Sequence, residues 1–286
     1  MADISQEMDI IENAAYGEQV RTAIIDAATA INDDMNAIEN TNKFLEDDTY
    51  HGCYFRGKSL GTGATFEAAS TAEQRAAIAD GTFDDMFVGD YWTINNKVFR
   101  IADFNYFKTI GDTSFATNHL VIVPDNALLN AVMNDENITT GAYIGSKMYS
   151  DPAGGLAQAK SIIDGLFGTY MASHRIYLPN AVSADGAESA GAWVDSTVDL
   201  LSEVMVYGCK IKSKANAGTF IATSEKSQLA LFRLNPLMVN VRITYWLRDV
   251  VSSTLFAYVG SYGSAANYGA SYSYGVRPFF TIKGTK

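Results

Sequence analysis

The sequence predicts an α+β fold behind a helical N-terminal segment, and three observations predict it. Apolar residues recur at helical spacing within the first 48 residues. From Gly89 onward, segments rich in aromatic and β-branched residues indicate strands. These segments do not alternate regularly with helical ones, which favours α+β over a doubly wound parallel sheet.

Composition places the chain among globular proteins with a sizeable core. It has 286 residues, of which 48 % are hydrophobic and 19 % are charged. The formal net charge of −11 argues against nucleic-acid binding, which needs clustered Lys and Arg. No apolar run reaches the roughly 18 residues of a membrane span, so no membrane insertion is expected. The acidic start MADISQEMDII lacks the apolar stretch of a signal peptide, and Cys53 and Cys209 are therefore expected to be reduced thiols.

Residues 1–48 are predicted to form a helical, coiled-coil oligomerisation segment. The spacing alternates between four and three residues, which is the seam of a coiled coil. Asn42 is a polar residue on this seam, and such a residue often sets register and oligomeric state. A single amphipathic helix packed on its own domain is the alternative. The seam positions are Ile24, Ala28, Ile31, Met35, Ile38, Asn42 and Leu45.

Residues 49–82 are predicted to form a connector. Glycines interrupt regular structure at its start, and STAEQRAAIADG then predicts a short helix. Ser70 and Glu73 fit a capping box at the start of this helix, and Gly81 is a natural stop.

Residues 83–286 are predicted to form the α+β domain. The expected strands are YWTINNKVFRIA, HLVIVP, TYWLRDV, LFAYVG and GVRPFFTIK. The expected helices are DNALLNAVMN, GLAQAKSIIDGLFG and VDLLSEVMVYG.

One stretch matches the phosphate-binding P-loop pattern. Gly52 to Ser59 spells GCYFRGKS, but a working P-loop follows a buried strand and opens a helix. The preceding LEDDTYH is too polar for such a strand, and the following LGTGATF is too rich in glycine for a helix. Asp125 could serve as the magnesium-binding carboxylate, but Pro124 beside it argues against a central strand. Nucleotide binding is not expected.

Other signs of catalysis are weak. His51, His119 and His174 stand singly, without Cys or His neighbours at metal-ligand spacing. The chain lacks a G-x-S-x-G elbow and a C-x-x-C pair. A pair of carboxylates for glycoside hydrolysis remains an alternative, because the fold brings such residues together and their spacing in the sequence does not identify them. We expect that the protein is not an enzyme and that it has no catalytic residue, metal or cofactor.

Tyrosine is concentrated near the C-terminus. The segment Tyr258–Tyr274 holds five of the sixteen tyrosines among Ser, Gly, Ala and Asn, and no charged residue lies between Asp249 and Arg277. This composition is typical of antibody-like binding surfaces, in which tyrosine supplies contact area and small residues supply adaptability. A loop whose tyrosines pack inward and a low-complexity tract are the alternatives. Strand-like segments on both sides favour a binding loop on a rigid scaffold.

Several longer motifs resemble the C-type-lectin-like domains of bacteriophage tail proteins. YWLRDV at Tyr245–Val250 and GVRP at Gly275–Pro278 carry the resemblance most clearly. It extends upstream through GDYWTIN, FRIADFNY, NHLVIVPD, ITTGAYIGSKMY, WVDSTVDLLSEVMVYGCK and KSQLALFRLNP, from about Phe83 to Lys283. The N-terminal AAYGEQVRTAIIDAATAIND is similar to the leading helix of tail and baseplate proteins.

The resemblance implies a C-type-lectin-like head, of the fold that formylglycine-generating enzymes share, on an N-terminal coiled-coil stalk. The paired catalytic cysteines of those enzymes have no counterpart here. In the family the first and last strands of the domain pair, and diversity-generating retroelements vary one exposed face. Trp246, Arg248, Arg277 and Pro278 would be scaffold. The ligand-binding face would hold Ser252, Ser253, Tyr258, Ser261, Tyr262, Ser264, Asn267, Tyr268, Ser271, Tyr272 and Ser273.

The implied function is host attachment by a virion protein made in the bacterial cytoplasm. Its partners would be a bacterial surface receptor, either protein or glycan, other tail or baseplate proteins, and two further copies in a homotrimer. A structural tail or baseplate subunit, with the tyrosines in a subunit contact, is the alternative. A hydrolase of surface glycan is a more distant one.

Overall fold

The structure is a computed structural model that describes residues 12, 17, 18, 22, 24–35, 51–108, 111–113, 115–214 and 227–285. The chain divides into two compact units, Met1–Tyr50 and His51–Lys286. In the first unit, residues 24–35 are helical. Ile24, Ile31 and Met35 are 44, 60 and 40 % exposed on this helix, so the described residues of this unit do not bury its apolar stripe. The seam positions beyond residue 35 lie outside the described residues.

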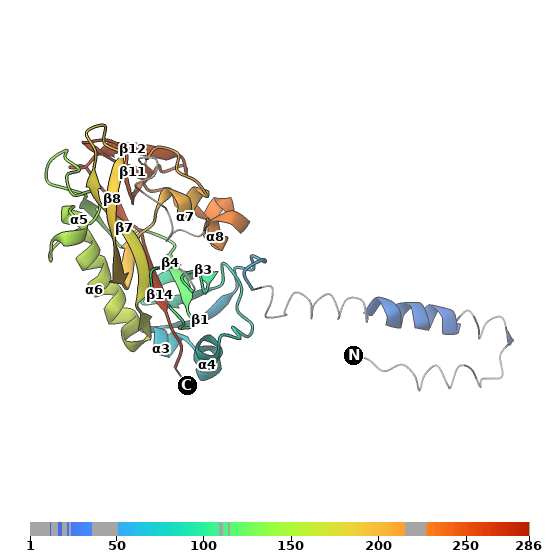
Figure 1. Ribbon diagram of the computed structural model, residues 1–286. Helices are drawn as coiled ribbons and strands as arrows, with labels where there is room; N and C mark the ends of the chain where they lie inside the picture. Colours follow the sequence, from blue (N-terminus) through green and yellow to red (C-terminus); the bar gives the residue numbers. More distant parts are fainter. Residues whose placement is uncertain are drawn as a thin grey trace. The chain divides into compact units, whose positions relative to one another are not determined.

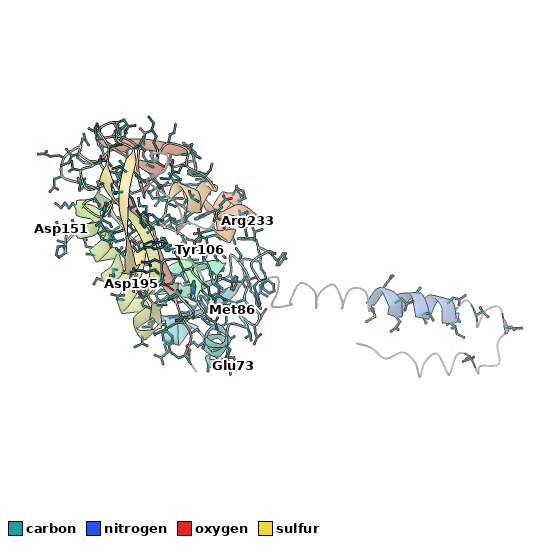
Figure 2. The ribbon with its side chains drawn as sticks, viewed as in Figure 1. Glu73, Met86, Tyr106, Asp151, Asp195 and Arg233 are labelled. Carbon is teal, nitrogen blue, oxygen red and sulfur yellow. The ribbon has the colours of Figure 1, made fainter. Side chains whose placement is uncertain are left out.

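The second unit is a mixed α+β structure in which sheets predominate (Figure 1). Its helices are short except for α4 and α6. Side chains fill the space between the helices and the sheets (Figure 2). The strands are β1 (Ser59–Gly63), β2 (Tyr91–Ile94), β3 (Lys97–Phe104), β4 (Leu120–Pro124), β5 (Leu129–Val132), β6 (Met171–Ala172), β7 (His174–Val182), β8 (Glu188–Ser196), β9 (Val198–Leu200), β10 (Tyr245–Val250), β11 (Leu255–Val259), β12 (Ala265–Gly269), β13 (Ser273–Val276) and β14 (Pro278–Ile282). The helices are α3 (Phe66–Ala69), α4 (Ala72–Asp80), α5 (Lys147–Ser150), α6 (Gly155–Phe167), α7 (Glu203–Tyr207) and α8 (Ala230–Leu234), with 3₁₀ turns η2 (Gly168–Tyr170) and η3 (Pro236–Met238).

The described strands form three sheets. A seven-stranded sheet runs β1-β2-β3-β4-β14-β6, with β9 also paired to β14. A five-stranded sheet runs β12-β11-β10-β13-β5, and β7 and β8 form a separate hairpin. In Figure 1 this hairpin runs alongside α6 and reaches the end of the unit where β11 and β12 lie. β13 of the five-stranded sheet and β14 of the seven-stranded sheet are separated only by Arg277. The chain therefore passes directly from one large sheet to the other at this point.

All five strand segments predicted from the sequence contain strands. YWTINNKVFRIA forms the hairpin β2–β3, whose turn places Asn95 and Asn96 at φ 47° and 61°. Asparagine tolerates this left-handed conformation better than most residues. TYWLRDV contains β10, and GVRPFFTIK contains β14, with every residue of both strands buried.

The predicted helices are only partly correct. GLAQAKSIIDGLFG forms α6 and ends at Gly168, as predicted. The helix of STAEQRAAIADG is also present, but its capping box uses Thr71 and Gln74, one residue later than predicted, because Ser70 caps the end of α3. DNALLNAVMN is wrong as a helix, since it contains β5, which pairs with β13. In VDLLSEVMVYG only Glu203–Tyr207 is helical, and Val198–Leu200 forms β9.

The first and last strands of the domain do not lie side by side in the described part of the chain. β14 pairs with β4, β6 and β9, whereas β2 lies between β1 and β3. The pairing implied by the lectin-like resemblance is therefore not found here. β3 and β4 intervene because they form a continuous antiparallel meander with β2.

Residues 51–82, expected as a connector, pack into the second unit. β1 pairs in parallel with β2, and Phe66 and Ile78 are fully buried in the same core as Trp92. The rings of Phe66 and Trp92 meet edge to face at 5.1 Å. Among the described residues, no helix combines the length and apolar character needed to cross a membrane.

Candidate ligand-binding face

The expected ligand-binding residues all lie on the five-stranded sheet or in its turns. Ser252 and Ser253 form the turn between β10 and β11, and Tyr258 lies on β11. Ser261, Tyr262 and Ser264 lie in the turn between β11 and β12, and Asn267 and Tyr268 lie on β12. Ser271 and Tyr272 lie in the turn leading into β13, and Ser273 is the first residue of β13.

Four tyrosines from these elements form one connected aromatic cluster, which we call the tyrosine patch: Tyr258, Tyr268, Tyr272 and Tyr274. Tyr268 and Tyr272 meet edge to face with ring centroids 4.3 Å apart. Tyr274 lies 6.1 Å from Tyr268 and 5.0 Å from Tyr258. The buried ring of Trp246 lies beneath the patch, 4.8 Å from Tyr274. Exposed rings therefore rest on a fixed aromatic base.

Strand alternation divides the expected residues between two faces. Tyr268 is paired with Phe256 and Asn267 with Ala257, so neighbouring side chains on β12 point to opposite sides of the sheet. Asn267 therefore faces away from the tyrosine patch. Tyr262 stands apart in the β11–β12 turn and is 88 % exposed. The exposed face expected from the resemblance thus consists here of the patch, the turns beside it and Tyr262.

Two neighbouring segments, the loop between β5 and α5 and the tip of the β7–β8 hairpin, hold the turns in place. Asn137 Oδ1 accepts hydrogen bonds from the backbone N–H and the hydroxyl of Ser271, at 3.0 and 2.9 Å. Thr139 donates its hydroxyl to the Ser252 carbonyl at 2.8 Å. At the tip of the β7–β8 hairpin, a Cβ on Gly186 would lie 2.3 Å from the Cα of Ser252, so only glycine fits this contact.

Two phenols of the tyrosine patch have a raised pKa. The hydrogen bond with Tyr272 raises the pKa of Tyr268, and burial raises the pKa of Tyr274, so both phenols stay protonated. The protein's negative charge also lies elsewhere in the sequence. Residues 1–50 hold two of the 21 basic and twelve of the 32 acidic residues, which leaves a formal charge of −1 for residues 51–286.

Sequence reasoning did not assign two contributors to this face. Tyr274 is not among the residues expected on the ligand-binding face, although it follows Tyr272 at the two-residue spacing that places side chains on one side of a strand. Asn137 gave no signal, because its contact with Ser271 spans 134 residues of sequence.

Replacing Asn137 with alanine is expected to loosen the turn that carries Tyr272. Two hydrogen bonds to Ser271 are lost, and each contributes about 0.5–1.5 kcal/mol to stability. Hydrogen exchange at the Ser271 amide should become faster, while exchange in the buried strand β14 should not change. Asn137→Asp is the matched control, because it keeps an oxygen acceptor at the same position. Equal exchange rates in all three proteins would show that Asn137 does not anchor the turn.

The P-loop match has the wrong surroundings in the structure as well. Strand β1 begins at Ser59, so no helix follows the glycine-rich stretch. Lys58 Nζ forms an ion pair with Asp85 at 2.8 Å, and Arg100 pairs with Asp125 at 2.5 Å. Within the described residues, no three His, Cys, Asp or Glu side chains gather as a metal site would require. Comparison of the chain with protein-family models, with curated proteins and with solved structures gives no match.

Proposed function

We propose that the protein is a receptor-binding protein of a bacteriophage tail, and that the tyrosine patch with Tyr262 binds a ligand on the bacterial surface. The observation that carries the proposal is the exposure of tyrosines on a rigid base. Tyr262, Tyr268 and Tyr272 are 88, 40 and 48 % exposed, whereas Trp246 beneath the patch is fully buried. Tyrosine and tryptophan are the residue types that dominate binding hot spots.

Rigid support makes this arrangement suited to recognition. A tyrosine orders only two side-chain torsions on binding, and a turn that is already anchored loses little further entropy. The motifs YWLRDV and GVRP resemble those of lectin-like tail proteins. They lie on either side of the tyrosine-rich segment, on β10 and at the junction of β13 and β14. On this proposal the second unit is a C-type-lectin-like head of the virion, and a retroelement varies its tyrosine-rich segment.

Loss of the exposed tyrosines is expected to weaken attachment without unfolding the protein. Tyr262→Ala, Tyr268→Ala and Tyr272→Ala each remove a ring from the proposed contact, and truncating such a ring typically costs about 2 kcal/mol or more of binding free energy. We expect a loss of about 30-fold in the affinity of the labelled protein for host cells, measured by flow cytometry. The thermal midpoint should change little.

Tyr54→Ala is the matched control, because Tyr54 is 42 % exposed and lies outside the five-stranded sheet. Its attachment should equal that of the unaltered protein. Equal attachment by all four variants would contradict ligand binding by the patch. If the patch variants attach normally but no longer assemble with other tail proteins, the tyrosines form a subunit contact instead.

We propose further that the N-terminal unit joins three copies of the chain. The described helix leaves Ile24, Ile31 and Met35 uncovered, and an isolated helix of this length is marginal in water. Each copy also brings a formal charge of −10 from residues 1–50. Repulsion between these charges opposes assembly and is screened by salt.

Sedimentation equilibrium of the full chain should therefore give three times the chain mass of 31.0 kDa, with tighter association as salt is added. Ile31→Lys places a charge on the apolar stripe and should yield monomers. Ala30→Lys adds the same charge at an exposed position beside the stripe and should still assemble. If the full chain is monomeric at both low and high salt, the proposal that residues 1–48 form an oligomerising stalk is wrong.

A further inference from the structure

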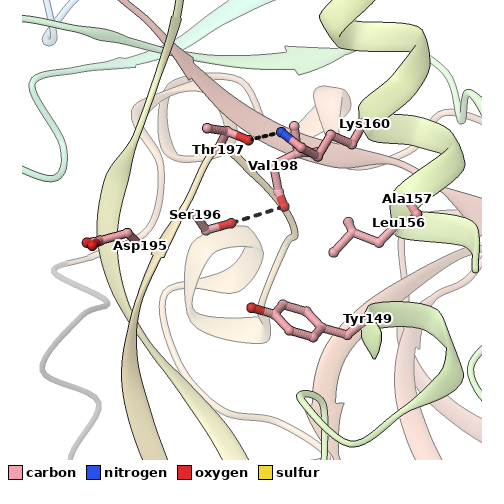
Figure 3. Close-up of a pocket in the computed structure, with 8 residues that line it drawn as sticks. All are labelled: Tyr149, Leu156, Ala157, Lys160, Asp195, Ser196, Thr197 and Val198. Atoms are coloured by element: carbon pink, nitrogen blue, oxygen red, sulfur yellow. Dashed lines mark hydrogen bonds between the residues drawn. The ribbon is translucent and has the colours of Figure 1, made fainter. Parts of the chain in front are cut away.

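A hollow of about 390 Å³ lies between the helices α5 and α6 on one side and the strands β8 and β9 on the other (Figure 3). None of the residues that line it belongs to the tyrosine patch. Its volume falls within the range of roughly 300–1,000 Å³ that is usual for small-ligand pockets. Such pockets combine apolar walls with a few converging polar groups, and this one does the same.

One half of the hollow is apolar. Leu156 and Ala157 from α6, Val198 from β9 and the ring of Tyr149 form this half. The Tyr149 ring packs edge to face on the fully buried ring of Tyr143, with centroids 5.0 Å apart. The apolar wall is thus held by the core.

The other half is polar. Lys160 Nζ donates a hydrogen bond to Thr197 Oγ1 at 2.6 Å, and Figure 3 shows the hydroxyl of Tyr149 directed toward the strand that carries Ser196. Within the part of the chain that the structure describes, no hydrogen-bond partner is found for this hydroxyl. Burial, and then the nearby charge of Asp199, raise the pKa of Tyr149 to about 12, so the phenol stays protonated and can donate.

The charged side chains around the hollow are already in ion pairs. Lys160 lies 3.4 Å from Asp164, and Arg175 is shared between Asp195 at 3.2 Å and Asp112 at 2.8 Å. A charged ligand would have to compete with these ion pairs. A neutral ligand can fill the site without disturbing them.

We propose that this hollow binds one neutral pyranose unit of a glycan. A pyranose ring has a face of C–H groups that can lie on the Tyr149 ring, and a rim of hydroxyls that both donate and accept hydrogen bonds. The phenol of Tyr149 and the ammonium of Lys160 supply donors, and Thr197 Oγ1 supplies an acceptor. The inference does not depend on ligand binding at the tyrosine patch, so a negative result at one site does not contradict the proposal for the other.

The test is saturation-transfer NMR on the full chain with three probes: methyl α-D-glucopyranoside, methyl α-D-galactopyranoside and N-acetyl-D-glucosamine. A ligand of this size is expected to bind with a millimolar Kd, since few atoms make contact. We expect saturation transfer to at least one probe, strongest at the ring C–H protons. No transfer to any probe at tens of millimolar would overturn the proposal.

Two substitutions on α6 locate the binding. Ala157→Phe places a ring inside the hollow and should weaken binding at least about tenfold. Gln158→Phe adds the same ring at the exposed neighbouring position and should leave binding unchanged. Tyr149→Phe keeps the aromatic wall and removes only the hydroxyl, so it should weaken binding about five- to tenfold.

Two results would place the ligand elsewhere or change its class. If Ala157→Phe binds the probe as well as the unaltered protein, the sugar does not occupy the hollow. If D-glucuronate binds at least about tenfold more tightly than the neutral glycosides, the ion pairs around the hollow do not govern the choice of ligand, and the proposal of a neutral unit is wrong.

Discussion

Trp246→Ala is expected to lower the free energy of unfolding of the second unit by about 3–5 kcal/mol, the usual cost of truncating a buried aromatic residue. Trp246 is fully buried on the central strand of the five-stranded sheet. It supports the rings of Tyr258 and Tyr274, and its indole N–H donates to the Ala131 carbonyl on β5 at 2.9 Å. Removing the indole leaves a cavity and takes away the hydrogen bond that links β10 to β5.

Denaturant unfolding followed by circular dichroism measures this loss as a shift of the midpoint at constant slope. Trp193→Ala is the matched control, because Trp193 is only half-buried on the separate hairpin β7–β8. Its midpoint should shift much less. The three exposed tyrosine variants should also shift little, and an equally large shift for them would mean that the tyrosines are core residues and not a binding surface.

The strands that cross the core were predictable because their residue types are those usually found in buried strands. β10 and β14 are short runs of aromatic and branched residues, and such runs favour strands whatever surrounds them. α6 was predictable for a similar reason, since its apolar residues follow one helical face and Gly168 ends it at φ 54° and ψ −125°, a conformation that glycine adopts readily.

The hairpin β7–β8 was not predictable in the same way. β7 contains Pro179, and β8 contains Gly191 among small and polar residues that usually avoid strands. Their pairing along nearly the whole length of both strands compensates for this weak local preference. β5 shows the opposite error, because its Leu, Asn and Ala read as helix until pairing with β13 decides the conformation.

The candidate face was also only partly predictable from the sequence. Composition identified the tyrosine-rich segment, because no spatial information is needed to count tyrosines. Which tyrosines share a face depends on strand register, and the turns between them depend on Asn137, Thr139 and Gly186 from distant parts of the chain. These contacts arise only from the tertiary fold.

A buried contact between His174 and Asp199, beside β14, is the basis of the second large expected effect. His174 Nε2 lies 3.4 Å from Asp199 Oδ2, and both side chains are completely buried. Neither this nitrogen nor either carboxylate oxygen has a hydrogen-bond partner within the described residues. The Thr281 hydroxyl donates to the Ala172 carbonyl at 2.8 Å, so it can only accept from His174 Nδ1, which lies 3.2 Å away. Nδ1 therefore carries a proton.

Asp199 is the buried side chain that faces Nε2 of His174. Asp199→Ala removes this group and leaves the buried imidazole nitrogen without its neighbour. Breaking a buried pair from one side typically costs about 3–5 kcal/mol of stability. Asp199→Asn keeps the volume, and its amide N–H can donate to Nε2 of a neutral imidazole, so its cost should be about 1 kcal/mol.

His174→Phe with Asp199→Leu tests the same account by removing both partners. A phenyl ring can keep the stacking on Phe107, whose centroid lies 4.4 Å from that of His174. Because well-packed apolar residues often replace a buried pair at little or no cost, the double variant should be more stable than Asp199→Ala alone. Denaturant unfolding of all three variants provides the comparison. If Asp199→Ala is as stable as Asp199→Asn, the pair contributes nothing beyond the space that it fills.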